Sequence, residues 1–236
     1  KGKEEAKKLA RVTFTLLAII TTVMVVVGMI FSPQIVSVIA RGFLGDPEKF
    51  YLTTLLTRIM FPFLLFISLA ALVMGVLNST GNFGPPAFYS AVYNLVNIAT
   101  ILLLAPYFQE PVNASAIGVT LGGLAQFLIQ LPALNRQDLS IALLKPTFPL
   151  HAGVVKMGRL ILPTIFGLSV TQVNLLVNTF LASYLPLGSV SYLYYGMRLI
   201  HFPLGIFAVA LSTALLPTLS SQAAKKDFAS LSRSFS

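Results

Sequence analysis

The sequence predicts an all-α fold, a polytopic bundle of transmembrane helices, from its composition and its long apolar runs. The chain of 236 residues is 56% hydrophobic and 10% charged, with a mean hydropathy of +0.85. Soluble domains carry about 25% charged residues, so this chain cannot cover one core with a polar shell. Its charge-free runs also exceed the roughly 20 residues that a helix needs to cross a bilayer. Most of the chain is therefore expected to lie in lipid.

Turn-forming residues divide these runs into six expected helices. The run after Ile59 is interrupted at residues 78–86 by a cluster of Asn, Gly and Pro, and the run after Leu160 is interrupted at 185–188. A β-barrel is disfavoured because the segments lack period-2 alternation and are about twice as long as a membrane strand requires. The expected helices cover residues 12–40, 51–77, 86–106, 114–132, 158–184 and 189–220.

Basic residues concentrate on one side of this predicted topology. If residues 1–11 are cytoplasmic, the segments on that side carry 12 of the 16 Lys and Arg residues, and the opposite segments carry only Arg41 and Lys49. Cytoplasmic loops are enriched in Lys and Arg, so both ends of the chain are expected to face the cytoplasm. No nucleic-acid partner is expected from the net charge of +9, because aromatic residues do not alternate with the basic ones.

Two arginines fall inside the expected helices at different depths. Arg58 lies ~10 Å from the outer end of its helix, where a long side chain can reach the interface. Arg198 lies ~14 Å into its helix, near the midplane of a ~30 Å core. An arginine at the midplane costs at least ~2.5–3.5 kcal/mol, so Arg198 is expected to face a partner or a water-filled cavity. Because no expected helix contains an acidic residue, its counter-charge comes from outside this chain or from an anionic ligand.

Two further features follow Arg198 in the same expected helix. His201 is three residues on and shares its helical face, where it either packs and hydrogen-bonds or responds to protons. Pro203 frees a backbone carbonyl, which makes it a candidate hinge together with Gly205. A simple packing kink at Pro203 is the alternative interpretation.

Amide side chains mark two of the other expected helices. Asn174 and Asn178 are four residues apart and share a face, whereas Gln172 is turned about 160° away from Asn174. Amides in lipid most often hold helices together, at about 0.6 kcal/mol each, and this role is favoured over direct contact with a ligand. Asn94 and Asn97 receive the same interpretation.

Several distinct sequence motifs occur along the chain. The second half contains Gln172–Ser183, Gly188–Tyr195, Phe202-Pro-Leu-Gly205 and Leu215–Ser220, and the first half contains Arg58-Ile-Met-Phe-Pro62. Through these motifs the chain resembles, almost end to end, the MurJ (MviN) family of bacterial lipid II flippases. Related polysaccharide exporters and drug antiporters share the fold but are much less similar to this chain.

The resemblance implies a 14-helix transporter of two lobes around a central cavity, of the multidrug/oligosaccharidyl-lipid/polysaccharide exporter superfamily. The chain is then expected to be an internal piece holding family helices three to eight. Residues 1–132 form the end of the first lobe, 133–157 form a cytoplasmic connection, and 158–236 form the start of the second lobe. The implied function is not enzymatic: lipid II, an undecaprenyl-diphosphate-linked peptidoglycan precursor, moves to the outer leaflet of the bacterial inner membrane by alternating access. Export of another lipid-linked oligosaccharide or of drugs is the alternative.

The resemblance also places Arg198 at the family's cavity arginine, where a guanidinium suits a diphosphate. This chain departs from the family pattern at two positions near Arg198: Met197 and His201 occupy positions where many members carry Asp and Glu. No metal or cofactor is expected, since the helices hold no set of His, Asp and Glu ligands, and the expected partners are lipid II and membrane lipids. The candidate substrate-binding residues are Arg198, His201, Asn174, Asn178, Gln172 and Arg58, with Pro203 and Gly205 as the hinge.

Overall fold

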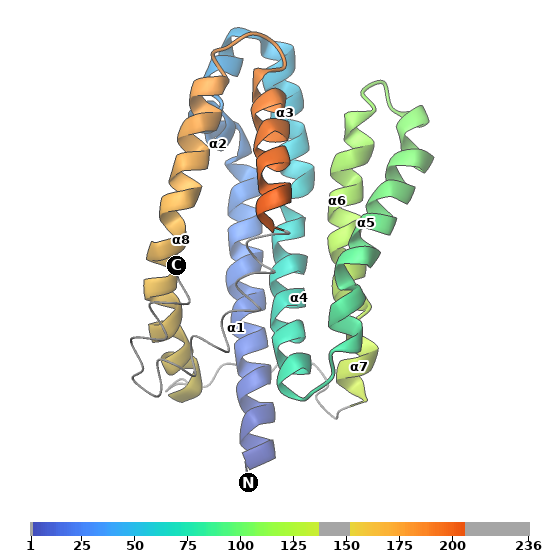
Figure 1. Ribbon diagram of the computed structural model, residues 1–236, viewed down its shortest axis with the longest axis vertical. Helices are drawn as coiled ribbons and strands as arrows, with labels where there is room; N and C mark the ends of the chain where they lie inside the picture. The colour runs from blue at the N-terminus through green and yellow to red at the C-terminus, as the bar shows by residue number, and fades with distance from the viewer. Residues whose placement is uncertain (1, 137–151, 206–236) are drawn as a thin grey trace, which may run out of the picture. The chain divides into compact units, whose positions relative to one another are not determined.

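The computed structural model describes residues 2–136 and 152–205, and all regular secondary structure in those ranges is helical (Figure 1). By length and composition, five helical stretches there can cross a membrane. A further helix occupies residues 189–205, and the remainder of the expected helix 189–220 lies outside the described residues. The all-α, polytopic fold class is thereby confirmed. The five stretches are Glu4–Ile30, Pro47–Ser79, Gly84–Tyr107, Val112–Asn135 and Ala152–Ala182.

The chain divides into two compact units, Lys1–Phe180 and Leu181–Ser236. The predicted lobe boundary at 133–157 stays a prediction, and residues 137–151 of it lie outside the described ranges. The α-helices of the first unit are α1 (Gly2–Ile30), α2 (Ser32–Ile39), α3 (Pro47–Met60), α4 (Pro62–Ser79), α5 (Gly84–Leu104), α6 (Val112–Leu128), α7 (Leu131–Asn135) and all but the last two residues of α8 (Ala152–Ala182).

Several helices begin earlier than hydropathy predicts, and α8 starts at Ala152 instead of residue 158. α1 starts at Gly2 instead of residue 12, because its polar first turns contain good helix formers and a Glu4–Lys7 ion pair with an N–O distance of 3.4 Å. α3 starts at Pro47 instead of residue 51, because the carboxylate of Asp46 accepts a hydrogen bond from the backbone N–H of Lys49 at 3.1 Å. Charged residues thus extend α1 and α3 beyond their apolar parts.

Proline interrupts both of the first two expected spans. The expected helix 12–40 is divided at Phe31, just before the Ser32-Pro33 start of α2. The expected helix 51–77 is divided at Phe61, just before Pro62 begins α4. Proline has no backbone N–H and its ring crowds the preceding turn, which explains why neither span is one regular helix. The turn predicted between the second and third spans is confirmed, with Gly81 at φ +78° between α4 and α5.

Small residues bring α5 and α6 close together. Gly118 and Gly122 are four residues apart and face α5, where an added Cβ on Gly122 would lie 3.0 Å from the backbone oxygen of Tyr93. A Cβ on Gly118 would collide with the side chain of Asn97. Helices in membranes associate through such small-residue faces, because the backbones can then approach closely. Asn97 therefore lies in a helix interface, where its Oδ1 is buried without a hydrogen-bond partner, whereas Asn94 is exposed. The role of Asn97 in holding the helices together stays a prediction.

The core of the first unit lies between α1, α4 and α7. It contains Phe14 from α1, with Val73 and Leu77 from α4. The interior of the unit also holds a polar residue, since Gln130 is fully buried. The Nε2 of Gln130 donates to the backbone oxygens of Gln126 at 3.0 Å and of Ala70 at 3.4 Å, which ties the end of α6 to α4.

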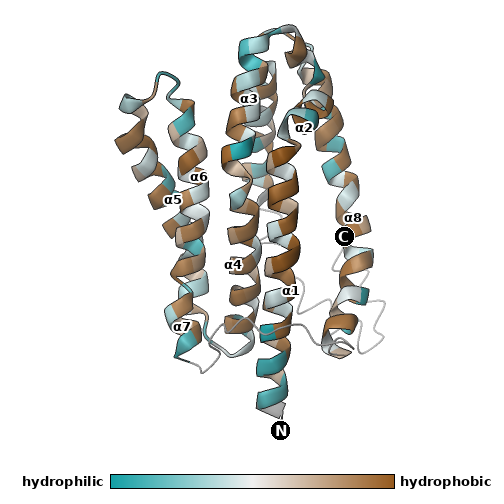
Figure 2. Cartoon of the chain, turned by 180° about the vertical axis from the view of Figure 1, so that it is seen from behind, coloured by the Kyte–Doolittle hydropathy of each residue, from teal (hydrophilic) through white to brown (hydrophobic). Residues whose placement is uncertain are grey.

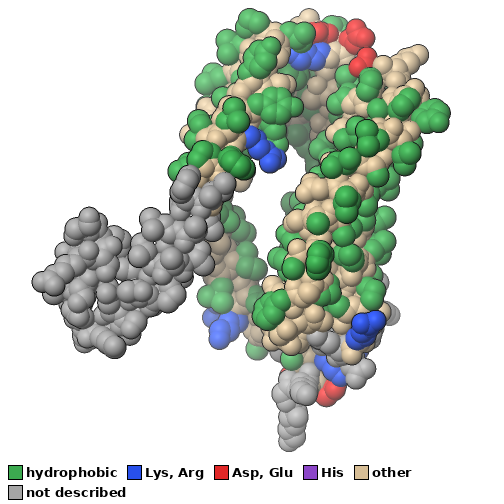
Figure 3. Space-filling model, turned by 45° about the vertical axis from the view of Figure 1, so that its right-hand side comes forward, with side chains coloured by type: hydrophobic (Ala, Val, Ile, Leu, Met, Phe, Trp, Pro, Cys, Tyr) green, Lys and Arg blue, Asp and Glu red, His purple; other side chains and the backbone are tan. Residues whose placement is uncertain are grey.

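Hydrophobic side chains cover the outer surfaces of the helices. The hydropathy colours in Figure 2 are mainly brown along α1 and α4 and turn teal at the N-terminal end of α1. Figure 3 likewise shows hydrophobic side chains spread along the helices of the visible face. Such surfaces suit contact with lipid or with further helices.

Candidate functional site

Arg198 is held by a neighbour on its own helix. Its Nη2 and Nε donate to the phenol oxygen of Tyr194 at 2.7 and 3.1 Å, and the guanidinium carbon lies 5.2 Å from the centre of that ring. Residues four apart on a helix are neighbours, so the spacing itself makes this contact possible. The phenol orients the guanidinium without neutralising it. Sequence reasoning missed Tyr194 as the partner, although the four-residue spacing was the signal that could have found it.

His201 also bonds one turn back along the same helix. Its Nδ1 lies 2.7 Å from the backbone oxygen of Met197. A carbonyl oxygen can only accept, so Nδ1 carries the hydrogen and Nε2 of the neutral ring is an acceptor. Pro203 and Gly205 lie at the end of the described helix, which is continuous from 189 to 205. Their role as a hinge stays a prediction.

The amides of α8 bond to each other. Asn178 Nδ2 donates to Asn174 Oδ1 at 2.8 Å, which confirms that the two residues share a helical face. Gln172 is exposed, and the most apolar part of α8 has no buried residue. The contacts that these amides make with a ligand or with other helices stay a prediction.

Arg58 lies in the first unit and has a different environment. From α3 its Nε donates to the backbone oxygen of Met29 at 3.1 Å and to the hydroxyl of Ser32 at 3.2 Å. The Ser32 hydroxyl in turn donates to the Met29 oxygen at 3.0 Å, and Ser32 is fully buried. Sequence reasoning gave Arg58 a route to the membrane interface and a place among the candidate substrate-binding residues, but no partner within the chain. The missed signal is Pro33, four residues after Met29 and unable to donate to its carbonyl.

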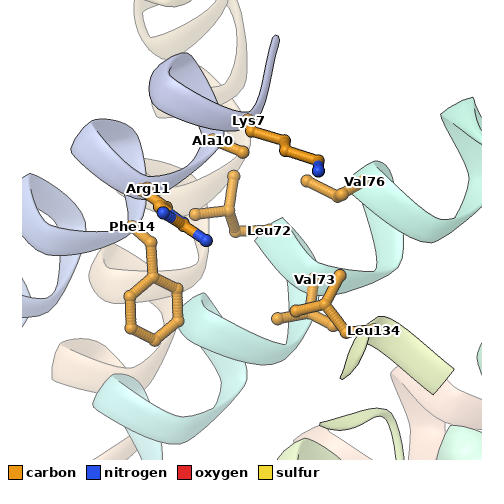
Figure 4. Close-up of a pocket in the computed structure, with 8 residues that line it drawn as sticks. All are labelled: Lys7, Ala10, Arg11, Phe14, Leu72, Val73, Val76 and Leu134. Atoms are coloured by element: carbon orange, nitrogen blue, oxygen red, sulfur yellow. The ribbon is translucent and has the colours of Figure 1, made fainter. Parts of the chain in front are cut away.

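A pocket in the first unit contains none of the candidate residues. Its cavity, between α1, α4 and α7, is small, with a volume of about 20 Å³. Figure 4 shows Lys7 and Arg11 extending from α1 toward α4, beside Phe14 and Leu72. Both basic residues belong to the segment 1–11 that is expected to be cytoplasmic. Within the described ranges, no group of three or more His, Cys, Asp or Glu side chains could hold a metal ion.

Comparison with known proteins identifies the family. The model of the family described as lipid II flippase MurJ matches residues 1–236. The chain belongs to the MurJ family. A probable lipid II flippase MurJ from Haemophilus influenzae is 41% identical over 208 residues, which are 85% of this chain and 40% of that protein. The lipid II flippase MurJ of Burkholderia cenocepacia is 40% identical over 221 residues, which are 93% of this chain and 43% of that protein.

This chain of the MurJ family spans about two fifths of the length of these curated relatives. The resemblance read from the motifs is therefore confirmed, and so is the multi-pass helical character that the family and the apolar helices share. A more distant MurJ relative, from Rickettsia prowazekii, is 31% identical over 93% of this chain. The family membership thus rests on similarity along nearly the entire chain.

Proposed function

We propose that the complete protein containing this chain is a lipid II flippase. It moves the undecaprenyl-diphosphate-linked peptidoglycan precursor from the cytoplasmic to the outer leaflet of the bacterial inner membrane, without covalent chemistry. The observation that carries the proposal is Arg198, a cation near the middle of its expected span whose bonded partner is the uncharged phenol of Tyr194. A guanidinium in a low-dielectric site binds phosphate through paired N–H groups, and lipid II offers a diphosphate.

The contact with Tyr194 prepares Arg198 for this role. The phenol oxygen accepts hydrogen bonds from two guanidinium N–H groups. These bonds fix the plane of the guanidinium and limit the rotamers of Arg198. The end of the guanidinium formed by Nη1 and Nη2 still has N–H groups to offer a phosphate. Because the plane is fixed before binding, less side-chain entropy is lost when the diphosphate binds.

Further polar side chains of the chain are candidates for contact with the substrate. His201 offers Nε2 as an acceptor, and the Asn174–Asn178 pair and Gln172 offer amides that suit hydroxyl and amide groups of a sugar-linked substrate. In a transporter of two lobes, rocking exposes such a site first to one side of the membrane and then to the other. Arg198 then binds the diphosphate during one part of the cycle and releases it in another.

Substitution of Arg198 in the complete protein tests the proposal. Arg198→Ala should abolish flipping of labelled lipid II in proteoliposomes while insertion continues, because the change removes a burial cost of ~2.5–3.5 kcal/mol. Arg198→Lys should retain part of the activity, since it keeps the charge but loses the planar fork. Arg159→Ala, which removes an exposed arginine from α8, is the matched control and should flip normally. Normal flipping by Arg198→Ala would contradict the proposal.

Replacing the native flippase in cells separates the two candidate substrates. A lipid II flippase should support growth when the native lipid II flippase is depleted. An exporter of another lipid-linked oligosaccharide or of drugs should not, although it would still insert into the membrane. Growth that depends on Arg198 favours the lipid II function.

We further propose that both ends of this chain face the cytoplasm, as the distribution of basic residues indicates. The chain contains no cysteine, so single cysteines can be labelled without background from it. A cysteine replacing exposed Lys8 should be protected from an impermeant reagent added outside intact cells. Cysteines replacing exposed Glu48 or Glu110 should react, and the reverse pattern would contradict the orientation.

A further inference from the structure

The interruption between α1 and α2 removes the usual donor from one backbone carbonyl. In a regular helix the N–H of residue 33 would donate to the carbonyl of residue 29, but residue 33 is proline. The Met29 oxygen accepts instead from Arg58 Nε at 3.1 Å and from Ser32 Oγ at 3.0 Å. A backbone carbonyl in a membrane needs such a partner, because lipid offers none.

At the second interruption, between α3 and α4, a backbone carbonyl also accepts a hydrogen bond from a side chain of another helix. The carbonyl of Ile59, at the end of α3, accepts a hydrogen bond of 2.7 Å from Thr120 Oγ1 of α6. The two interruptions are also in contact, since an added Cβ on Gly28 of α1 would collide with the ring of Phe61 between α3 and α4. At each interruption, a side chain from another helix supplies a donor to the backbone.

We propose that Arg58 is a positioning residue, whose Nε replaces the N–H that Pro33 lacks and holds α1 and α2 in a fixed arrangement. Its bonded side points to buried Ser32 and to the backbone of Met29, which are groups of the protein itself. Arg58 thus acts on transport through the geometry of the α1–α2 span and not through contact with the diphosphate. Its importance for activity rests on the proposed function, whereas its effect on helix geometry does not.

A specific dependence on Pro33 follows from this geometry. Pro33→Ala restores an N–H that can donate to the Met29 carbonyl, so the span no longer needs the Arg58 donor. If Arg58 instead contacted the substrate, replacing Arg58 would lower activity whether residue 33 is proline or alanine. The pair Pro33→Ala and Arg58→Met therefore distinguishes a positioning role from a substrate contact.

The decisive measurement is a distance across the interruption in a cysteine-free version of the complete protein. Spin labels replace exposed Met24 of α1 and exposed Val38 of α2, roughly 20 Å apart at 1.5 Å per residue. Arg58→Met should broaden the measured distance distribution. Adding Pro33→Ala to Arg58→Met should return its width to that of Pro33→Ala alone.

Thr120→Val provides the matched control, because it removes a donor at the other interruption. It should leave the Met24–Val38 distribution unchanged, with or without Pro33→Ala. In the flipping assay, Arg58→Met should lower the rate about tenfold, which is the lower end of the effect of losing a hydrogen bond from a charged donor. The lower end is expected because the Ser32 hydroxyl still donates to the Met29 oxygen.

The distance distributions decide the proposal. An unchanged width in Arg58→Met, or a broadening that persists in the double variant, would overturn it. If Arg58→Met stopped flipping without altering the width, Arg58 would act on the substrate and only the lipid II proposal would stand. If Arg198→Ala still flipped lipid II, the proposed function would fail, yet the coupling between Arg58 and Pro33 would remain measurable.

Discussion

The helices from α1 to α7 and the segment from α8 to residue 205 are similarly apolar but use their polar side chains differently. In the first region, Arg58 bonds to a residue 29 positions away, Thr120 to one 61 positions away and Gln130 to one 60 positions away. In the second region, Asn178 and Arg198 each bond four residues back along the same helix. These three side chains of the first region join separate helices, whereas Asn178 and Arg198 of the second are oriented locally and can meet partners outside this chain.

Burial follows the same division. The most apolar windows of the Val112–Asn135 and Ala152–Ala182 spans have mean hydropathies of 1.6 and 1.8, yet 33% of the first is buried and none of the second. Hydropathy therefore measures how well a helix suits the membrane and does not report whether it packs against its neighbours. Glycine placement is more informative, since Gly118 meets Asn97 of α5, whereas Gly167 of α8 has open space where a Cβ would be.

The largest effect on folding should separate these two glycines. Gly118→Leu overpacks the α5–α6 interface and should destabilise the chain by ~1–3 kcal/mol or more. Gly167→Leu should have little effect on the 236-residue chain, because its added side chain meets open space. Thermal unfolding of the two variants in detergent, followed by circular dichroism, compares them. Equal losses of stability would mean that the contrast between the two regions is wrong.

A smaller effect should appear in activity when Arg198 loses its anchor. Tyr194→Phe removes the hydroxyl that accepts two guanidinium N–H groups and keeps the ring. The rate of lipid II flipping by the complete protein should fall about tenfold, the lower end of the effect expected when a charged donor loses its acceptor. Tyr195→Phe is the control, because Tyr195 contacts Tyr194 edge to face at 5.7 Å through its ring. If only Tyr195→Phe lowered the flipping rate, Tyr194 would not be the residue that orients Arg198.

The smallest effect should distinguish bonds between helices from bonds within one. Thr120→Val removes a donor to the Ile59 carbonyl and should cost about 0.6 kcal/mol of stability. Thr164→Val in α8 removes a bond to Leu160, in the same helix, and should be close to neutral. Chemical unfolding of the 236-residue chain can compare the two variants. A greater loss in Thr164→Val would indicate that α8 is more tightly packed than its exposure implies.

Sequence reasoning located the membrane helices because apolar length and turn chemistry are local properties. The break around Gly81 and the shared face of Asn174 and Asn178 were predictable for that reason. The interruptions before Pro33 and Pro62 were missed, because a single proline hardly changes the hydropathy averaged over a long apolar run. The partners of Arg58 were also missed, because they depend on how separate helices meet.

The candidate site was only partly accessible from the sequence. The depth of Arg198 followed from counting residues along a helix, and its contact with Tyr194 was available from the same spacing. The surroundings of His201 and of the α8 amides depend on how separate segments meet, which the spacing of residues along one helix does not report. No local pattern can specify the groups that those segments place opposite these side chains.

The buried amide of Gln130 has a consequence for how the first unit sits in a bilayer. Its bonds to Gln126 and to the Ala70 carbonyl join α6 to α4 at one height. A shift of α4 by one residue would move that carbonyl by ~1.5 Å and break a bond that is already 3.4 Å long. Sliding of the two helices past each other is therefore opposed by a buried polar contact. Lipid that is thicker or thinner than the apolar span should tilt α4 and α6 together and leave their relative depth unchanged.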